Sequence, residues 1–211
     1  MRTLYYYPGN ASMAPHMVLE EIGAPYELRL VDRDKGAHKA SDYLRLNPNG
    51  LIPAFVDGDM VLFESAAICL HLADRHPEAQ LVPAVGTDAR AHLYKWLVHL
   101  TNTVQAELIT YFYGDRLVDD AAAAAQVKAH AEARVAAMFD RIEAALAQNG
   151  PHLLGDTFSV ADLYLLMLAR WTRNMQRPAR TLPAVRALLD RTLARPAVAR
   201  VFANEKLDPP F

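Results

Sequence analysis

Two short segments carry residue types that could clamp a small peptide. Residues 47–53 read Asn-Pro-Asn-Gly-Leu-Ile-Pro, and Glu64 and Ser65 open an apolar helical stretch. A residue that precedes proline is held extended, so it can present its backbone amide and carbonyl to a ligand. A helix that begins at Glu64 and Ser65 points its first N–H groups at a carboxylate. The spacing therefore predicts a site for a small peptide that carries an acidic end.

The composition is that of an ordinary soluble globular protein, and it restricts the class of partner. The chain has 211 residues, 52% of them hydrophobic, and a formal net charge of −2. A chain with this net charge has no overall positive potential to attract the phosphate backbone of a nucleic acid, so we expect no nucleic-acid partner. Residues 1–8 lack a signal-peptide pattern, residues 160–171 are too short to span a bilayer, and the single Cys69 excludes an intrachain disulfide. We expect a cytoplasmic protein that does not bind a membrane.

The first third of the chain alternates strand-like and helical patterns, which is typical of an α/β domain. Residues 3–7 and 26–31 are rich in strand formers, and residues 14–22 and 64–73 have helical patterns. Residues 54–61 indicate a hairpin that turns at Asp57 and Gly58. Between residues 76 and 87, prolines and a glycine replace periodicity, which predicts a linker. We therefore expect an N-terminal domain over residues 1–78.

The second half of the chain predicts helices throughout. Apolar residues recur at three- and four-residue steps over residues 93–108 and again over residues 135–146. Ser159 and Asp162 have the spacing of a capping box, so a helix should start at Ser159 and run to Trp171. We expect an all-α domain over residues 87–211.

Four motifs in this order resemble the cytosolic glutathione S-transferase superfamily. Residues 6–16 are similar to the first strand, loop and helix of bacterial members, nearest to the beta class. Residues 47–53 are similar to the stretch that ends in the family's cis-proline, Glu64 and Ser65 to its acidic residue and serine, and residues 155–162 to its capping motif. The resemblance covers nearly the whole chain. It implies a thioredoxin-like N-terminal domain, an all-helical C-terminal domain and a homodimer.

The resemblance also implies where glutathione, as co-substrate, is held. Pro53 is expected in the cis form, which frees the backbone of Ile52 to pair with the cysteinyl residue of glutathione. Ser65 and the N-terminus of its helix would hold the γ-glutamyl carboxylate, and Glu64 would support the γ-glutamyl end. Plainer alternatives stay open, since Pro53 could end an edge strand and Ser65 could be an N-cap.

His38 and Lys39 occupy positions similar to those that contact the glycyl carboxylate in related transferases. Both lie in a polar stretch before Tyr43. A solvated loop charge is the alternative for each of them.

Three residues are candidates for activating the thiol of glutathione. A free thiol has a pKa of about 8.5 and is mostly protonated at neutral pH, so its thiolate must be stabilised. Ser12 stands just before the helix expected at Ala14 and is the leading candidate to donate a hydrogen bond. Tyr6 aligns with the activating tyrosine of other classes, and Asn10 could donate from its amide. The alternatives are an N-cap for Ser12, packing for Tyr6 and a turn role for Asn10.

The chain departs from the beta class at two positions. Ala11 occupies the position of the beta-class cysteine, and Gln105 that of its helical histidine, so a mixed disulfide with glutathione through that cysteine is excluded. Cys69 has apolar helical neighbours, which favours a buried, inert thiol. His16 and His99 lack neighbouring residues of metal-ligand type, so we expect no metal.

The resemblance implies a detoxifying transferase that conjugates glutathione to a small hydrophobic electrophile or reduces a hydroperoxide. Tyr111 and Trp171 are the candidates for the pocket of the second substrate, with core packing as the alternative. Two other functions stay open. One is a non-catalytic glutathione-binding or protein-interaction module on the same fold, and the other is a glutathione-dependent disulfide-bond reductase or isomerase.

Overall fold

The computed structural model describes residues 1–208, and these residues form two compact units. One unit combines Met1–Val82 with the C-terminal segment that begins at Leu193, and the other is Pro83–Thr192. The last segment therefore packs with the N-terminal unit, whereas the sequence placed it in a domain over residues 87–211. The last three residues of that range lie outside the described residues. The domain boundaries 1–78 and 87–211 stay a prediction.

The N-terminal unit is built on one mixed sheet of four strands. The strands are β1 (Arg2–Tyr6), β2 (Glu27–Leu30), β3 (Ala54–Asp57) and β4 (Met60–Leu62), in the order β2-β1-β3-β4. The central strand β1 pairs parallel with β2 and antiparallel with β3. The parallel pair needs a crossover, and a helix between β1 and β2 supplies it. The α/β prediction for this part of the chain is confirmed.

The predicted hairpin is present, but its turn lies one residue later than expected. Asp57 ends β3 and pairs with Met60, so Gly58 and Asp59 form the loop. Gly58 has a φ of 62°, a conformation that glycine adopts without a steric penalty. Placing the glycine first in the loop brings Asp57 into the ladder.

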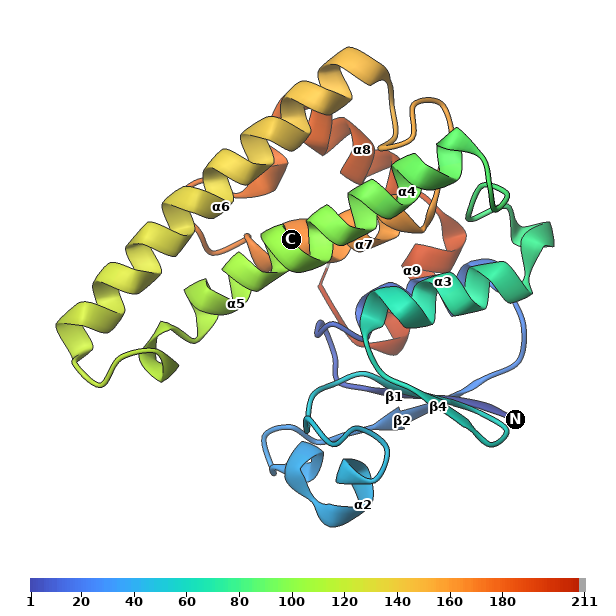
Figure 1. Ribbon diagram of the computed structural model, residues 1–211, viewed down its shortest axis with the longest axis horizontal. Helices are drawn as coiled ribbons and strands as arrows, with labels where there is room; N and C mark the ends of the chain where they lie inside the picture. The colour runs from blue at the N-terminus through green and yellow to red at the C-terminus, as the bar shows by residue number, and fades with distance from the viewer. Residues whose placement is uncertain (209–211) are drawn as a thin grey trace. The chain divides into compact units, whose positions relative to one another are not determined.

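Helices of the N-terminal unit pack around the sheet and around one another. They are α1 (Met13–Ile22), η1 (Ala37–Lys39), α2 (Ser41–Leu44), α3 (Ser65–Arg75), η2 (Pro77–Ala79) and, from the C-terminal segment, α9 (Pro196–Asn204). Helix α1 packs against both α3 and α9. Figure 1 shows α3 and α2 on opposite sides of the sheet. The core between sheet and helices holds fully buried Leu4, Met17, Phe55 and Ile68.

The second unit is helical, as predicted. Helix α4 (Asp88–His99), the π-helical segment η3 (Leu100–Gln105) and α5 (Ala106–Phe112) follow one another without a break. They are followed by η4 (Gly114–Arg116), α6 (Ala121–Asn149), α7 (Val160–Trp171), η5 (Ala179–Thr181) and α8 (Pro183–Leu193). Helix α6 packs along α5 (Figure 1). Within residues 1–208, no helix has both the length and the apolar character needed to cross a membrane.

The capping box sets the start of the buried helix α7. Ser159 is the N-cap, and its Oγ accepts a hydrogen bond from the Ala161 amide at 3.3 Å. The Asp162 carboxylate accepts one from the Ser159 amide at 2.8 Å. These bonds satisfy donors that the helix itself leaves without partners, which matters because residues 159–170 are all buried. The predicted start of this helix is confirmed.

Candidate functional site

The segment before β3 contains the cis bond that the sequence predicts. The Ile52–Pro53 peptide bond is cis. The Ile52 side chain is buried in a small cluster with Val31, Tyr43 and Ala54. This packing holds the backbone of residue 52 at the edge of the unit's core.

Two side chains brace this segment from within residues 43–53. Asn47, which is only 3% exposed, donates from Nδ2 to the carbonyl of Leu51 at 2.7 Å and to that of Pro53 at 3.4 Å. The Tyr43 hydroxyl also donates to the Leu51 carbonyl at 2.7 Å. Sequence reasoning quoted Asn47 within its motif but gave it no role. Its burial and its two acceptors identify it as the residue that fixes the loop.

Lys39 lies over the same loop. It belongs to η1, and its Nζ donates to the Asn49 carbonyl at 3.3 Å. Gly50 adopts a φ of 59°, and a Cβ at this position would lie 2.7 Å from Lys39 Nζ. Any larger residue at position 50 would therefore clash with the Lys39 side chain in this position. His38 lies half-buried in the same turn, so both predicted residues sit next to the predicted clamp.

Helix α3 begins with an unusual backbone at Glu64. Glu64 is the exposed N-cap and has a φ of 72°, which is rare for a residue with a side chain. Ser65 is the first helical residue, and its Oγ donates to the Ala11 carbonyl at 2.9 Å. The N-cap alternative for Ser65 is therefore wrong, because its hydroxyl reaches a different loop. This bond joins the start of α3 to the loop that carries the candidates for thiol activation.

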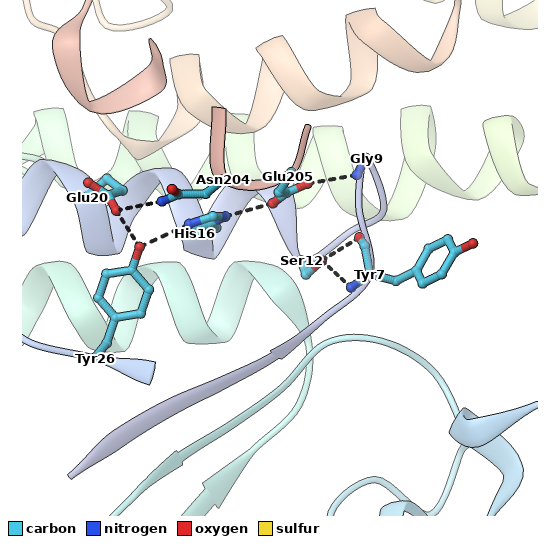
Figure 2. A network of polar contacts seen from close by, with 8 residues as sticks. All are labelled: Tyr7, Gly9, Ser12, His16, Glu20, Tyr26, Asn204 and Glu205. Carbon is cyan, nitrogen blue, oxygen red and sulfur yellow. Dashed lines mark hydrogen bonds and ion pairs between the residues drawn. The ribbon is translucent and has the colours of Figure 1, made fainter. Parts of the chain in front are cut away.

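The Ser12 hydroxyl is fully engaged with the backbone of Tyr7. Its Oγ donates to the Tyr7 carbonyl at 3.1 Å and accepts from the Tyr7 amide at 3.3 Å (Figure 2). Ser12 is completely buried and lies at the N-cap position of α1 without making a side-chain cap bond. Ser12 is therefore the N-cap residue by position, but its hydroxyl does not cap an N–H of the helix. A hydroxyl has one proton, and this one is donated to a carbonyl.

Asn10 and Tyr6 present different donors. Asn10 Oδ1 accepts from the Ala11 amide at 2.6 Å, which leaves the amide NH₂ as the donor side of Asn10. Tyr6 ends β1 and is half-buried. Burial, followed by the negative charge of Glu205, raises the pKa of Tyr6, so its phenol is a neutral donor at physiological pH.

The far end of the chain holds the same loop in place. Glu205, which follows α9, accepts a hydrogen bond from the Gly9 amide at 2.7 Å through Oε2. Its other oxygen pairs with His16 Nδ1 at 2.7 Å, and both side chains are completely buried. His16 Nε2 lies 3.0 Å from the Tyr26 hydroxyl, which in turn donates to Glu20 (Figure 2). Sequence reasoning missed this network because residues 16 and 205 are far apart and no local pattern links them.

Cys69 takes no part in the site. It lies in α3, is completely buried, and its burial raises the pKa of its thiol, as expected of an inert cysteine. Among residues 1–208, no group of three or more His, Cys, Asp or Glu side chains is arranged to hold a metal ion.

In the helical unit, the two residues predicted for the second substrate meet through a third. Tyr111 is buried, and its ring centroid lies 5.1 Å from that of Phe112. The Phe112 ring lies 6.3 Å from the ring of Trp171 and is 44% exposed. The three rings therefore form one aromatic cluster, and its exposed member, Phe112, was not in the predicted pair. Gln105, at the end of η3, accepts a hydrogen bond from Tyr164 at 2.5 Å.

Comparisons with known proteins cover both units. Residues 2–74 match the family model described as Glutathione S-transferase, N-terminal domain, and residues 102–205 match that described as Glutathione S-transferase, C-terminal domain. Glutathione S-transferase 3 of Zea mays is 39% identical over 92% of this chain and 89% of its own length. Glutathione S-transferase GST-4.5 of Xanthomonas campestris pv. campestris is 30% identical over 97% of this chain and 99% of its own length. The structure of a glutathione transferase homologue from Sulfitobacter with bound glutathione has a TM-score of 0.90, at 29% identity, and covers 98% of this chain and 99% of that chain.

Proposed function

This chain belongs to the cytosolic glutathione S-transferase superfamily, and from this premise we propose that it binds glutathione and stabilises the glutathione thiolate. The thiolate then attacks a small hydrophobic electrophile or reduces a hydroperoxide. One observation carries the proposal: the Ser65–Ala11 hydrogen bond ties the start of α3, with its unusual backbone at Glu64, to the loop of Asn10 and Ser12. This contact supports the proposal, because it ties the helix start proposed to bind a carboxylate to the loop proposed to carry the donors for sulfur.

Glutathione would lie along the N-terminal unit. Charged side chains and main-chain N–H groups would bind its two ends. The backbone of Ile52 would pair with the cysteinyl residue, and Glu64 would support the γ-glutamyl end. Because the Ser65 proton is donated to Ala11, the main-chain N–H groups at the start of α3 are the donors left for the γ-glutamyl carboxylate. His38 and Lys39 would attract the glycyl carboxylate.

One side-chain hydrogen-bond donor would supply enough free energy to activate the thiol. Lowering a pKa by about two units requires about 2.7 kcal/mol of preference for the charged form. A hydrogen bond to a charged group supplies about 1.5–3 kcal/mol, and a helix N-terminus about 0.3–1 kcal/mol. The sequence offers Ser12, Asn10 and Tyr6 for this donor. Since the Ser12 proton is committed to Tyr7, we assign the direct bond to the Asn10 amide and a loop-holding role to Ser12.

The remaining parts of the proposal concern the second substrate and the assembly. Tyr111 and Trp171 would supply an apolar wall for a small hydrophobic electrophile. The active form would be a homodimer in the cytoplasm, and sedimentation would then give twice the chain mass of 23.4 kDa.

Calorimetry with glutathione, followed by initial rates with three substrates, tests the proposed function. The substrates are an aryl halide, an organic hydroperoxide and a mixed disulfide of glutathione. We expect binding, together with conjugation or peroxidase rates above the uncatalysed reaction. Glutathione binding with no turnover of any substrate would favour the non-catalytic module, and turnover of the disulfide alone would favour the reductase.

A matched pair of variants ties the binding to this site. Glu64→Gln should weaken glutathione binding, whereas Glu78→Gln, at an exposed position of the same unit, should leave the affinity unchanged. Absence of glutathione binding in the unchanged protein would overturn the proposed function.

A further inference from the structure

Tyr7 belongs by its backbone to the loop that carries Asn10. It follows β1 directly, and its N–H and C=O are both bonded to the Ser12 hydroxyl. The half-buried side chain of Tyr7 extends away from Ser12 (Figure 2). The backbone and the side chain of Tyr7 therefore contact different parts of the N-terminal unit.

The side chain of Tyr7 packs against the core cluster that contains Ile52. The backbone of Ile52 is the part of the chain proposed to pair with the cysteinyl residue of glutathione. Ala37, the first residue of η1, packs against the same cluster. The cluster thus joins Tyr7 both to the segment of the cis peptide bond and to the short helix η1.

The hydroxyl of Tyr7 reaches the loop between β2 and η1. It donates to Asp34 Oδ2 at 2.6 Å. A tight turn follows Asp34, in which the Lys39 amide donates to the Gly36 carbonyl at 2.8 Å. Because the turn is tight, a displacement of Asp34 would be passed on to Lys39 and to its neighbour His38.

The donor in this bond keeps its proton at physiological pH. The hydrogen bond to Asp34, followed by burial, raises the pKa of the Tyr7 phenol. Asp32, another carboxylate of the same loop, has a partner within the loop, since Lys35 Nζ lies 2.8 Å from it. Asp34 differs from Asp32 because a residue from outside the loop holds it.

We propose that Tyr7 is a positioning residue for glutathione, and that its hydroxyl, through Asp34, sets the turn that receives the glycyl carboxylate. This rests on the proposed function, in which His38 and Lys39 attract that carboxylate. A turn that is already held in place binds an anion without the cost of being ordered first. Since the Tyr7 proton is donated to Asp34, Tyr7 acts on the affinity for the glycyl end and not on the thiol.

Calorimetry with two forms of the peptide tests this proposal on the full chain. Glutathione carries the glycyl carboxylate, and its glycyl ethyl ester lacks that charge but keeps the γ-glutamyl and cysteinyl residues. The unchanged protein should bind the ester about two- to fivefold more weakly than glutathione, as expected for an exposed charge pair. Tyr7→Phe removes only the hydroxyl. It should weaken glutathione by about two- to fivefold and leave the affinity for the ester unchanged.

A second variant shows whether the effect passes through Asp34. Tyr7→Phe should have no further effect in a chain that already carries Asp34→Ala, because the bond is absent there. A comparison within this background also removes the direct effect of the Asp34 charge on a bound anion. The pKa of the bound thiol should be the same in Tyr7→Phe as in the unchanged protein.

Tyr5→Phe is the matched control. Tyr5 packs against the same cluster, but its hydroxyl accepts a hydrogen bond from Arg29 at 3.4 Å. Loss of this hydroxyl should change neither affinity. Folding of each variant is checked by its thermal transition.

Several results would overturn the proposal. They are equal affinity of the unchanged protein for the two peptides, full glutathione affinity in Tyr7→Phe, or an undiminished effect of Tyr7→Phe in the Asp34→Ala background. Equal weakening of both peptides in Tyr7→Phe would also overturn it, because that result indicates a general loss of structure. In each of these cases glutathione still binds and the proposed function stands. If the unchanged protein binds neither peptide, the proposed function fails and this inference fails with it.

Discussion

At the scale of single residues, the Ser12 hydroxyl satisfies both backbone groups of Tyr7 and so shapes the loop between β1 and α1. Gly9 is fixed from the other side by Glu205. Asn10 therefore sits between two anchored positions, with its own Oδ1 bonded to the Ala11 amide. A donor held in this way loses little entropy when it binds a thiolate, which favours catalysis by preorganisation.

The roles of Ser12 and Asn10 can be separated by comparing stability with thiol activation. Ser12→Ala removes the partner of the Tyr7 N–H, whereas the Tyr7 carbonyl still accepts from the Asn10 amide at 3.1 Å, and the variant should lower the free energy of unfolding by about 1–3 kcal/mol. Asn10→Ala should lower it less and should instead raise the pKa of bound glutathione. Urea denaturation and a pH titration of the bound thiol measure the two effects. An unchanged stability and a raised thiol pKa in Ser12→Ala would assign the direct bond to Ser12.

Glu64, which we propose supports the γ-glutamyl end of glutathione, is held in an unfavourable backbone conformation. A non-glycine residue with a φ of 72° costs about 1–3 kcal/mol, and glycine relieves this at an entropic cost of about 0.5–1 kcal/mol. Glu64→Gly should therefore raise the free energy of unfolding by about 1 kcal/mol while weakening glutathione binding. Glu64→Ala keeps the strain and should weaken binding without any gain in stability. Chemical denaturation and calorimetry of both variants give the answer, and equal stability of the two would contradict the strain.

The sequence predicted local properties of residues more reliably than it predicted their hydrogen-bond partners. The cis bond at Pro53 and the burial of Cys69 were predicted correctly. The hydroxyls of Ser12 and Ser65 were each offered an N-cap alternative, yet both donate to carbonyls of residues outside their own helices. The local sequence shows where a serine could cap a helix. It does not show which carbonyl groups the tertiary fold brings close to the hydroxyl, and these compete with the cap bond.

At the scale of elements, the loop of residues 47–53 is held by the buried amide of Asn47 together with the Tyr43 hydroxyl. Asn47 donates from Nδ2 to two carbonyls, and its Oδ1 accepts from the Asn49 amide at 3.2 Å. The side chain must therefore carry both a donor and an acceptor. Asn47→Asp keeps the acceptor but turns the donor into a second acceptor that faces two carbonyl oxygens.

We expect Asn47→Asp to lower the free energy of unfolding by about 3 kcal/mol or more, since a buried carboxylate would face the carbonyl oxygens of Leu51 and Pro53. Glutathione affinity should fall with it, because the backbone of Ile52 belongs to the same loop. Asn49→Asp, at an exposed neighbouring position, is the matched control. A wild-type denaturation midpoint for Asn47→Asp would show that the loop does not depend on this amide.

Helices α1 and α9 are joined by carboxylates whose effect depends on pH. Glu20 of α1 accepts from Arg200 Nε of α9 at 2.5 Å, and from Tyr26. Burial alone would raise the pKa of Glu20, but the hydrogen bonds from Tyr26 and Arg200 outweigh it and lower the pKa below 4.5. A carboxylate with a lowered pKa stabilises the fold at neutral pH, and this contribution is lost as the pH falls through its folded pKa.

The Glu20→Gln variant tests this linkage. At pH 7 it should be less stable than the wild type by about 1 kcal/mol or less. The difference should shrink as the pH falls from 5 to 3, because the wild-type carboxylate becomes protonated. Thermal denaturation at several pH values measures it, with Glu27→Gln as a control at an ion pair on the exposed strand β2. A difference that stays constant down to pH 3 would contradict the assignment.

At the scale of the whole molecule, the segment after Thr192 returns to the N-terminal unit, where Glu205 contacts the loop between β1 and α1. The fold class was predictable because it rests on local periodicity and turn residues, and the start of α7 because its capping box is contiguous. The tie from Glu205 to Gly9 and His16 was not predictable. It joins positions 196 and 189 residues apart, and nothing near either position in the sequence indicates the other.

We propose that this protein lowers the pKa of the glutathione thiol, and the ultraviolet absorbance of bound thiolate across pH measures that pKa directly. We predict a thiolate band that titrates about two units below the free value of about 8.5. The same band should titrate closer to the free value in Asn10→Ala. A bound thiol that titrates at the free value in the unchanged protein would contradict the account.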